Sequence, residues 1–86
     1  MKQIWKYVID PAAEIDMPWG AEILCIQAQN DVACMWALVD PTARTIKRKF
    51  SVYGTGQVIP EVPGKYLGTF QLHGGSLVFH VFEEGV

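Results

Sequence analysis

Cysteine is scarce in this chain, and long apolar runs are absent. Its two cysteines, Cys25 and Cys34, are too few for the disulfide framework of a small secreted domain. No stretch approaches the roughly 18 apolar residues of a membrane-spanning helix. The N-terminal segment also lacks the continuous apolar run of a signal peptide. We therefore expect a cytoplasmic protein that has no membrane partner.

An excess of positive charge is missing as well. The formal net charge is −2 at pH 7, and the pI is about 5.5. General nucleic-acid binders and proteins that adhere to anionic membranes need a broad surplus of Lys and Arg. The composition therefore excludes both classes, although a few cationic groups still suffice for a small anionic ligand.

Apolar residues, in contrast, are abundant for so short a chain. Half of the 86 residues are hydrophobic and 12% are aromatic. A domain of this size buries only about 60–65% of the surface that its unfolded chain exposes. The surplus apolar surface predicts a partner, and self-association into a homo-oligomer is the simplest one.

Alternating apolar patterns separated by Gly and Pro predict an all-β fold. We expect a connection at residues 10–20, with room for one helical turn at 11–15, because Pro11, Pro18 and Gly20 interrupt regular structure. The spacing of the turns favours a single domain over residues 1–86, a small six-stranded meander barrel or sandwich with β-hairpins. The expected strands are residues 4–9, 22–29, 32–40, 45–53, 65–72 and 77–84.

The C-terminal hairpin, residues 65–84, is apolar on both faces. We expect Gly74 and Gly75 to form a primed turn, which needs positive φ angles. This register pairs Phe70 with Phe79 and Lys65 with Glu84, and it places Tyr66 and Phe82 on opposite faces. Because both faces need cover, it predicts a closed barrel, a second sheet or another copy of the chain.

The first hairpin turns at Asn30-Asp31 in our interpretation. Gln27 then lies opposite Cys34, and Cys25 lies opposite Trp36, so the thiols are diagonal neighbours on one face. Buried reduced thiols are favoured over a disulfide or a metal site. A zinc site would also need the two histidines to converge, which these registers do not allow, and we expect neither a metal nor a cofactor.

Two polar side chains fall among apolar ones by strand parity. Arg48 shares a face with Ile46, Phe50 and Val52. An inward guanidinium requires either an internal carboxylate such as Asp40 or an anionic ligand. His80 lies between Val78 and Phe82, either as a core histidine bonded to Thr69 or a carbonyl, or as a ligand contact. Both alternatives stay open at this point.

Five segments are informative together: Met17-Pro-Trp-Gly-Ala21, Trp36-Ala-Leu-Val-Asp-Pro41, Arg48-Lys-Phe-Ser-Val-Tyr-Gly-Thr-Gly56, Tyr66-Leu-Gly-Thr-Phe70 and Val78-Phe-His-Val-Phe-Glu83. They resemble a family of short all-β proteins encoded by bacteriophages and prophages. The likeness spans nearly the whole chain, and it implies a phage accessory protein in an infected or lysogenic bacterial host. Small oligomeric phage proteins of this size class include inhibitors that sequester the nucleotide signals of bacterial immunity in pockets where protomers meet.

Three functional hypotheses follow. In the leading one, the protein sequesters a nucleotide-type signal at or near a protomer interface: Arg48 and the amides of the Gly54-Thr55-Gly56 turn receive phosphate, while an aromatic ring meets the base. The alternative is an interaction module that docks on a host or phage protein through its second apolar sheet face. The third is a nucleotide-cleaving enzyme with His80 as general acid or base. The expected ligand residues are Arg48, Trp36, Tyr53, Gly54, Thr55, Gly56, His80, Gln27 and Gln29.

Overall fold

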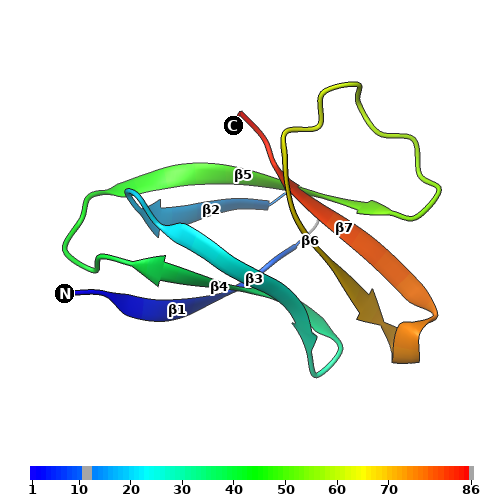
Figure 1. Ribbon diagram of the computed structural model, residues 1–86, viewed down its shortest axis with the longest axis horizontal. Helices are drawn as coiled ribbons and strands as arrows, with labels where there is room; N and C mark the ends of the chain where they lie inside the picture. Colours follow the sequence, from blue (N-terminus) through cyan, green and yellow to red (C-terminus); the bar gives the residue numbers. More distant parts are fainter. Residues whose placement is uncertain (11–12, 86) are drawn as a thin grey trace.

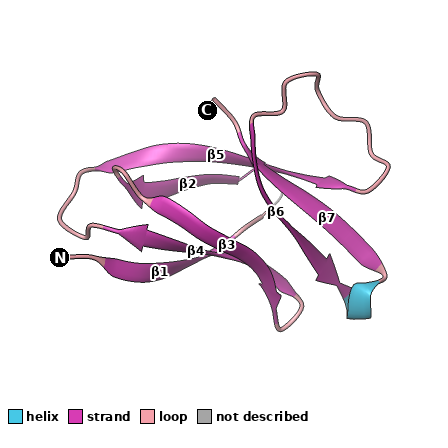
Figure 2. Ribbon diagram, viewed as in Figure 1, coloured by secondary structure: helices cyan, strands magenta, loops and turns pink. Residues whose placement is uncertain are grey.

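The computed structural model describes residues 1–10 and 13–85 and is all-β, which confirms the predicted fold class (Figures 1 and 2). A short 3-10 turn, η1 at His73–Gly75, connects the last two strands. No helix that could span a membrane occurs in the described ranges. The strands are β1 (Gln3–Val8), β2 (Ala13–Pro18), β3 (Glu22–Gln29), β4 (Val32–Val39), β5 (Thr45–Gly54), β6 (Lys65–Leu72) and β7 (Leu77–Glu83).

The strands form two antiparallel sheets rather than a closed barrel. The three-stranded sheet has the order β1-β4-β3, and the four-stranded sheet has the order β2-β5-β7-β6. The meander prediction is therefore wrong: the β3–β4 and β6–β7 hairpins join neighbours, whereas β1 pairs with β4 and β2 with β5. At the seam between the sheets β3 and β6 approach closely, and a Cβ atom on Gly68 would lie 3.0 Å from the side chain of Ile26.

Strand β2 lies where we expected a connection, so the chain has one strand more than predicted. Its inward residues Ala13, Ile15 and Met17 alternate with Glu14 and Asp16, which form ion pairs with lysines of β5. Pro18 ends the strand at the sheet edge, where the missing N–H does not interrupt a ladder. The helical turn expected at 11–15 is wrong for residues 13–15, and its remainder lies outside the described residues.

Both predicted hairpin turns are confirmed. Asn30 and Asp31 have φ angles of 51° and 61°, and Gly74 and Gly75 have 67° and 96°. The register places Gln27 opposite Cys34 and Cys25 opposite Trp36, as expected, and both thiols are free. Phe70 also pairs with Phe79. The pairing next to each turn agrees with the prediction because the backbone twist of a primed turn matches the twist of the two antiparallel strands that it joins.

One register prediction is wrong. Lys65 pairs with Glu83 instead of Glu84, because an irregularity between Tyr66 and Gly68 inserts an extra residue into β6. A bulge of this kind reverses the facing of every side chain beyond it. Tyr66 therefore pairs with Phe82 of β7, and the two side chains lie on the same face of the sheet. Both residues line the candidate site.

The core lies between the inner faces of the two sheets. Its fully buried side chains come from both: Met17, Phe50 and Val81 belong to the four-stranded sheet, and Met35 and Val39 belong to β4. The rings of Phe70 and Phe79 stack with centroids 5.4 Å apart at the inner side of the second hairpin. The three-stranded sheet thus covers the inner face of the C-terminal hairpin. A second sheet was one of the three kinds of cover that the sequence left open.

Candidate ligand-binding cleft

The expected ligand residues fall in three separate places. Five of them line one cleft of about 330 Å³ on the outer face of the four-stranded sheet. Arg48 faces the opposite side of that sheet, and Trp36, Gln27 and Gln29 belong to the three-stranded sheet. The described residues that line the cleft are Tyr53, Gly54, Thr55, Gly56, Gln57, Ile59, Tyr66, His80 and Phe82.

Three aromatic rings form one part of the cleft. Phe82 on β7 lies between Tyr53 on β5 and Tyr66 on β6, with ring centroids 5.9 Å and 5.5 Å apart. Both contacts are edge-to-face, an arrangement that the quadrupoles of aromatic rings favour. Tyr66 nevertheless remains 55% exposed, so this aromatic surface is accessible to a ligand.

A chain of hydrogen bonds forms the polar part. The imidazole of His80 bonds Thr69 Oγ1 through Nδ1 at 3.0 Å and Thr55 Oγ1 through Nε2 at 2.8 Å. Thr69 Oγ1 also lies 2.5 Å from the hydroxyl of Tyr66. The bond between His80 and Thr69, one of the alternatives that the sequence left open, is present, and it arises because the two residues pair directly across β6 and β7. Both ring nitrogens are engaged, so the orientation of the imidazole is fixed.

The Gly54-Thr55-Gly56 segment is a tight turn. Gln57 N–H donates to the carbonyl of Gly54 at 3.0 Å, and Gly56 has a φ of 87°. The amide of Gly54 donates to Gln57 Oε1 at 2.9 Å, and that of Thr55 donates to the carbonyl of Val78 at 3.1 Å. Two of the three amides that we expected to receive phosphate are therefore already used within the protein.

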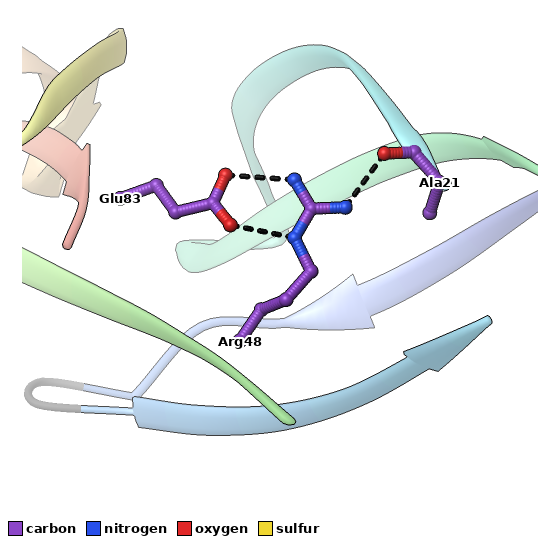
Figure 3. Close-up of polar contacts among 3 residues, drawn as sticks. All are labelled: Ala21, Arg48 and Glu83. Atoms are coloured by element: carbon purple, nitrogen blue, oxygen red, sulfur yellow. Dashed lines mark hydrogen bonds and ion pairs between the residues drawn. The ribbon is translucent and has the colours of Figure 1, made fainter. Parts of the chain in front are cut away.

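Arg48 forms an internal ion pair (Figure 3). Its Nε and Nη2 donate to the two carboxylate oxygens of Glu83 at 2.5 Å and 2.7 Å, and Nη1 donates to the carbonyl of Ala21 at 2.6 Å. The side chains of Arg48 and Glu83 are only 17% and 7% exposed. The bonds to Glu83 raise the pKa of Arg48, against the opposing effect of burial. Asp40, the partner that we named as an example, bonds Thr42 instead.

Trp36, Gln27 and Gln29 do not reach the cleft. Trp36 is half-buried in the centre of the three-stranded sheet, between Lys6 on β1 and Cys25 on β3. The ammonium group of Lys6 donates to Gln29 Oε1 at 2.7 Å across the central strand. These residues therefore belong to a different surface of the molecule.

Sequence reasoning missed four residues that line the cleft: Tyr66, Phe82, Gln57 and Ile59. Tyr66 was placed on the wrong face because the bulge in β6 was not anticipated. Gly68 was the available signal, since a glycine inside a strand often marks a bulge or a close backbone approach. Gln57 and Ile59 follow β5 in a long loop whose course no local pattern indicates.

The described residues contain no group of three or more His, Cys, Asp or Glu side chains that could hold a metal ion. The lining of the cleft offers aromatic rings and hydroxyl groups to a ligand. Comparison with curated proteins and with solved structures finds no match. A family match does cover residues 1–86, the entire chain, and the protein accordingly belongs to the family described as Domain of unknown function (DUF7352).

Proposed function

We propose that this protein binds a small ligand with a planar ring in the cleft between Tyr53, Tyr66 and Phe82. The observation that carries the proposal is the meeting of three aromatic rings with the bonded His80 in one accessible cleft. Ligand pockets typically hold about 300–1,000 Å³ and combine apolar walls with a few placed polar groups. The cleft, at about 330 Å³, agrees with the lower end of this range.

The ligand class is a nucleotide-type signal that the protein sequesters, as the resemblance to phage accessory proteins implies. In this proposal the base packs against Tyr66 and Phe82, and the hydroxyl of Thr55 bonds a polar edge of the ring. Base–aromatic stacking contributes about 1–3 kcal/mol for each base. The site thus recognises the ring of the nucleotide.

We expect a phosphate group to contribute less to ligand binding than the sequence predicted. Neither Lys nor Arg is among the described residues that line the cleft. Arg48 is bonded to Glu83 on the other side of the sheet, and the amides of Gly54 and Thr55 have partners. We therefore expect a nucleoside and the corresponding nucleotide to bind with similar affinity.

Binding is favoured over catalysis by the same chemistry. The described lining residues include no carboxylate, amine or thiol, so the only side chains there that could share a proton transfer with His80 are the weakly acidic phenols of Tyr53 and Tyr66. Both nitrogens of its ring are also engaged with threonine hydroxyls. A stable complex, rather than turnover, is the expected outcome of mixing the protein with its ligand.

Isothermal titration calorimetry with adenosine, guanosine, their 5′-phosphates, cyclic dinucleotides and ADP-ribose tests the proposal. A nucleoside and its 5′-phosphate are expected to differ by less than about tenfold, because a charge-assisted bond to phosphate contributes about 1.5–3 kcal/mol and would separate them further. Tyr66→Ala is expected to weaken binding by about tenfold or more. Trp19→Ala is the matched control, since Trp19 is 58% exposed and lies outside the cleft.

Two results contradict the proposal: no probe binds, or a probe binds and Tyr66→Ala leaves its affinity unchanged. Absorbance near 260 nm in gently purified protein is an independent measure, because a sequestered nucleotide co-purifies with its binder. Chromatography of the released compound then identifies the ligand.

A second candidate function rests on another observation. The outer face of the three-stranded sheet exposes Ile4, Val8 and Val32, and an apolar face of this kind is typical of protein–protein contact. A protein with this function binds a macromolecule and no nucleotide, so the calorimetric panel separates the two functions.

A further inference from the structure

A cavity of about 560 Å³ lies beside the first half of β5, at the other end of that strand from the aromatic cleft. Its described lining residues come from three segments, at positions 19–21, 46–49 and 83–85. The cavity and the aromatic cleft share none of these lining residues. It is therefore a separate site, and its chemistry follows from the strand beside it.

The first half of β5 is paired on one side only. Strand β2 runs along one side of it, whereas β7 pairs with β5 only from Phe50 onward. One further bond joins the amide of Glu84 to the carbonyl of Lys49 at 2.9 Å, and Gly85 then has a φ of 78°, which turns the chain out of the line of β7. Residues 45–48 therefore form an open edge within the described part of the chain.

The backbone of Lys47 presents hydrogen-bonding groups at this open edge. In an antiparallel ladder, the N–H and C=O groups of every second residue point to the same side of the strand. Because the carbonyl of Lys49 points toward the β7 side, the N–H and C=O of Lys47 point to that side as well, where no described strand lies. An edge of this kind can be completed by an extended chain that pairs with it.

The outer side of β5 indicates the charge of such a chain. Lys49 has Glu14 of β2 on one side and Glu84 on the other, so that an acid lies on each side of it. Lys47, whose side chain is 68% exposed, has Asp16 of β2 on one side and no described residue on the other. Opposite charges directly across a pair of strands are favourable, and like charges are not. A carboxylate at the open position would repeat around Lys47 the arrangement seen around Lys49.

The inner side of the same edge is apolar. Ile46 and Trp19 both line the cavity, and Trp19 is 58% exposed. The charge of Arg48 is already neutralised by Glu83 (Figure 3), so the inner side requires no further acid. An apolar side chain is therefore the group that fits there.

We infer that this edge binds an extended peptide of another protein, with a carboxylate opposite Lys47 and a neighbouring apolar side chain in the cavity against Ile46 and Trp19. Backbone bonds to Lys47 supply affinity, and the alternating side chains supply specificity. A second copy of β5 is a poor occupant, because it would add lysines instead of a carboxylate to the outer side. Peptide binding and ligand binding in the aromatic cleft use different residues, so either can fail while the other holds.

Fluorescence anisotropy with labelled hexapeptides tests the inference. The probe is a peptide with blocked ends in which Glu alternates with Val, and we expect saturable binding below about 1 mM. A peptide with Lys in place of Glu is expected to bind about threefold more weakly or worse, because it places like charges opposite each other. N-methylation of the Glu amides, which point toward Lys47, should weaken binding by about tenfold or more. N-methylation of the Val amides, which point away from β5, is the matched control and should leave most of the affinity.

A charge reversal on the protein tests the position of the peptide. Lys47→Glu is expected to weaken the Glu–Val peptide by about threefold or more and to favour the Lys–Val peptide. Lys2→Glu is the matched control, since Lys2 is exposed and lies outside the strands. Circular dichroism verifies that both variants are folded.

Amide hydrogen exchange then locates the bond itself. The amide of Lys47 should exchange more slowly when the Glu–Val peptide is added, while that of Arg48, which points toward β2, should change little. The inference is overturned if the Glu–Val peptide does not bind, or if the Lys–Val peptide binds equally well. Equal effects of the two N-methylations, or an affinity that Lys47→Glu does not change, would also overturn it.

Discussion

Removing one partner of the Arg48–Glu83 pair should be far more damaging than removing both. Arg48→Met leaves the Glu83 carboxylate, 7% exposed, without its two charge-assisted bonds. Breaking a buried pair in this way costs about 3–5 kcal/mol of unfolding free energy. For a domain of this size, each kcal/mol lowers the melting temperature by about 4–8 °C.

The double variant Arg48→Met, Glu83→Leu removes both charges and fills the space with apolar atoms. Replacement of a buried pair in this way is often neutral or stabilising. One carbonyl, that of Ala21, loses its donor in both variants, which costs about 1–3 kcal/mol if water does not reach it. We therefore expect the double variant to recover most of the stability that Arg48→Met loses.

Urea unfolding followed by tryptophan fluorescence, at one fixed protein concentration, measures these differences. Lys47→Met is the control, because the neighbouring Lys47–Asp16 pair is exposed and such pairs contribute about 0–1 kcal/mol. A loss below about 1 kcal/mol for Arg48→Met would show that water compensates the carboxylate. The reasoning is refuted if the double variant loses as much unfolding free energy as the single variants Arg48→Met and Glu83→Leu lose together.

Three further predictions concern single side chains and turns. Tyr7→Phe should preserve or increase the unfolding free energy by up to about 1–3 kcal/mol, because the buried hydroxyl of Tyr7 has no partner among the described residues; a loss of stability would reveal one. The hydroxyl of Thr42 and, to a smaller extent, its amide donate hydrogen bonds to Asp40 and hold the pKa of this carboxyl below its usual value. The stability that these bonds contribute is therefore present at neutral pH and is lost as the pH falls through the lowered pKa. In an NMR titration, Thr42→Ala should therefore raise the pKa of Asp40, and an unchanged pKa would contradict the assignment. Gly64→Ala should unfold the protein or lower its melting temperature strongly, since at a φ of 107° the new Cβ would lie 2.1 Å from a carbonyl oxygen of β7; Gly74→Ala, with open space around it, should cost only about 1–2 kcal/mol.

The parts of the fold that depend on local chemistry could be predicted from the sequence. Asn30-Asp31 and Gly74-Gly75 specify their own turns, and these turns determine the pairing of Gln27 with Cys34 and of Phe70 with Phe79. Parity then places Arg48 inward and His80 beside Thr69.

Features that depend on distant partners could not be predicted. The segment at residues 13–18 becomes a strand only because β5, about 30 residues later, pairs with it. Parity shows that Arg48 needs either an internal acid or an anionic ligand, but several acids were available and Glu83 is separated from it by 35 positions. The bulge in β6 reflects the close approach of Gly68 to Ile26 across the seam, a contact that no pattern within β6 contains.

The path of the chain has a consequence for how this protein folds. It crosses from one sheet to the other before β2, before β3 and before β5, so each sheet is assembled from separate parts of the sequence. Loops must close before β1 meets β4 and β2 meets β5, and folds dominated by such distant pairings reach the native state in about milliseconds to seconds. The two hairpins can form early by themselves, but neither sheet can be completed without them, so fragments of the chain should not fold and unfolding should occur in a single cooperative step.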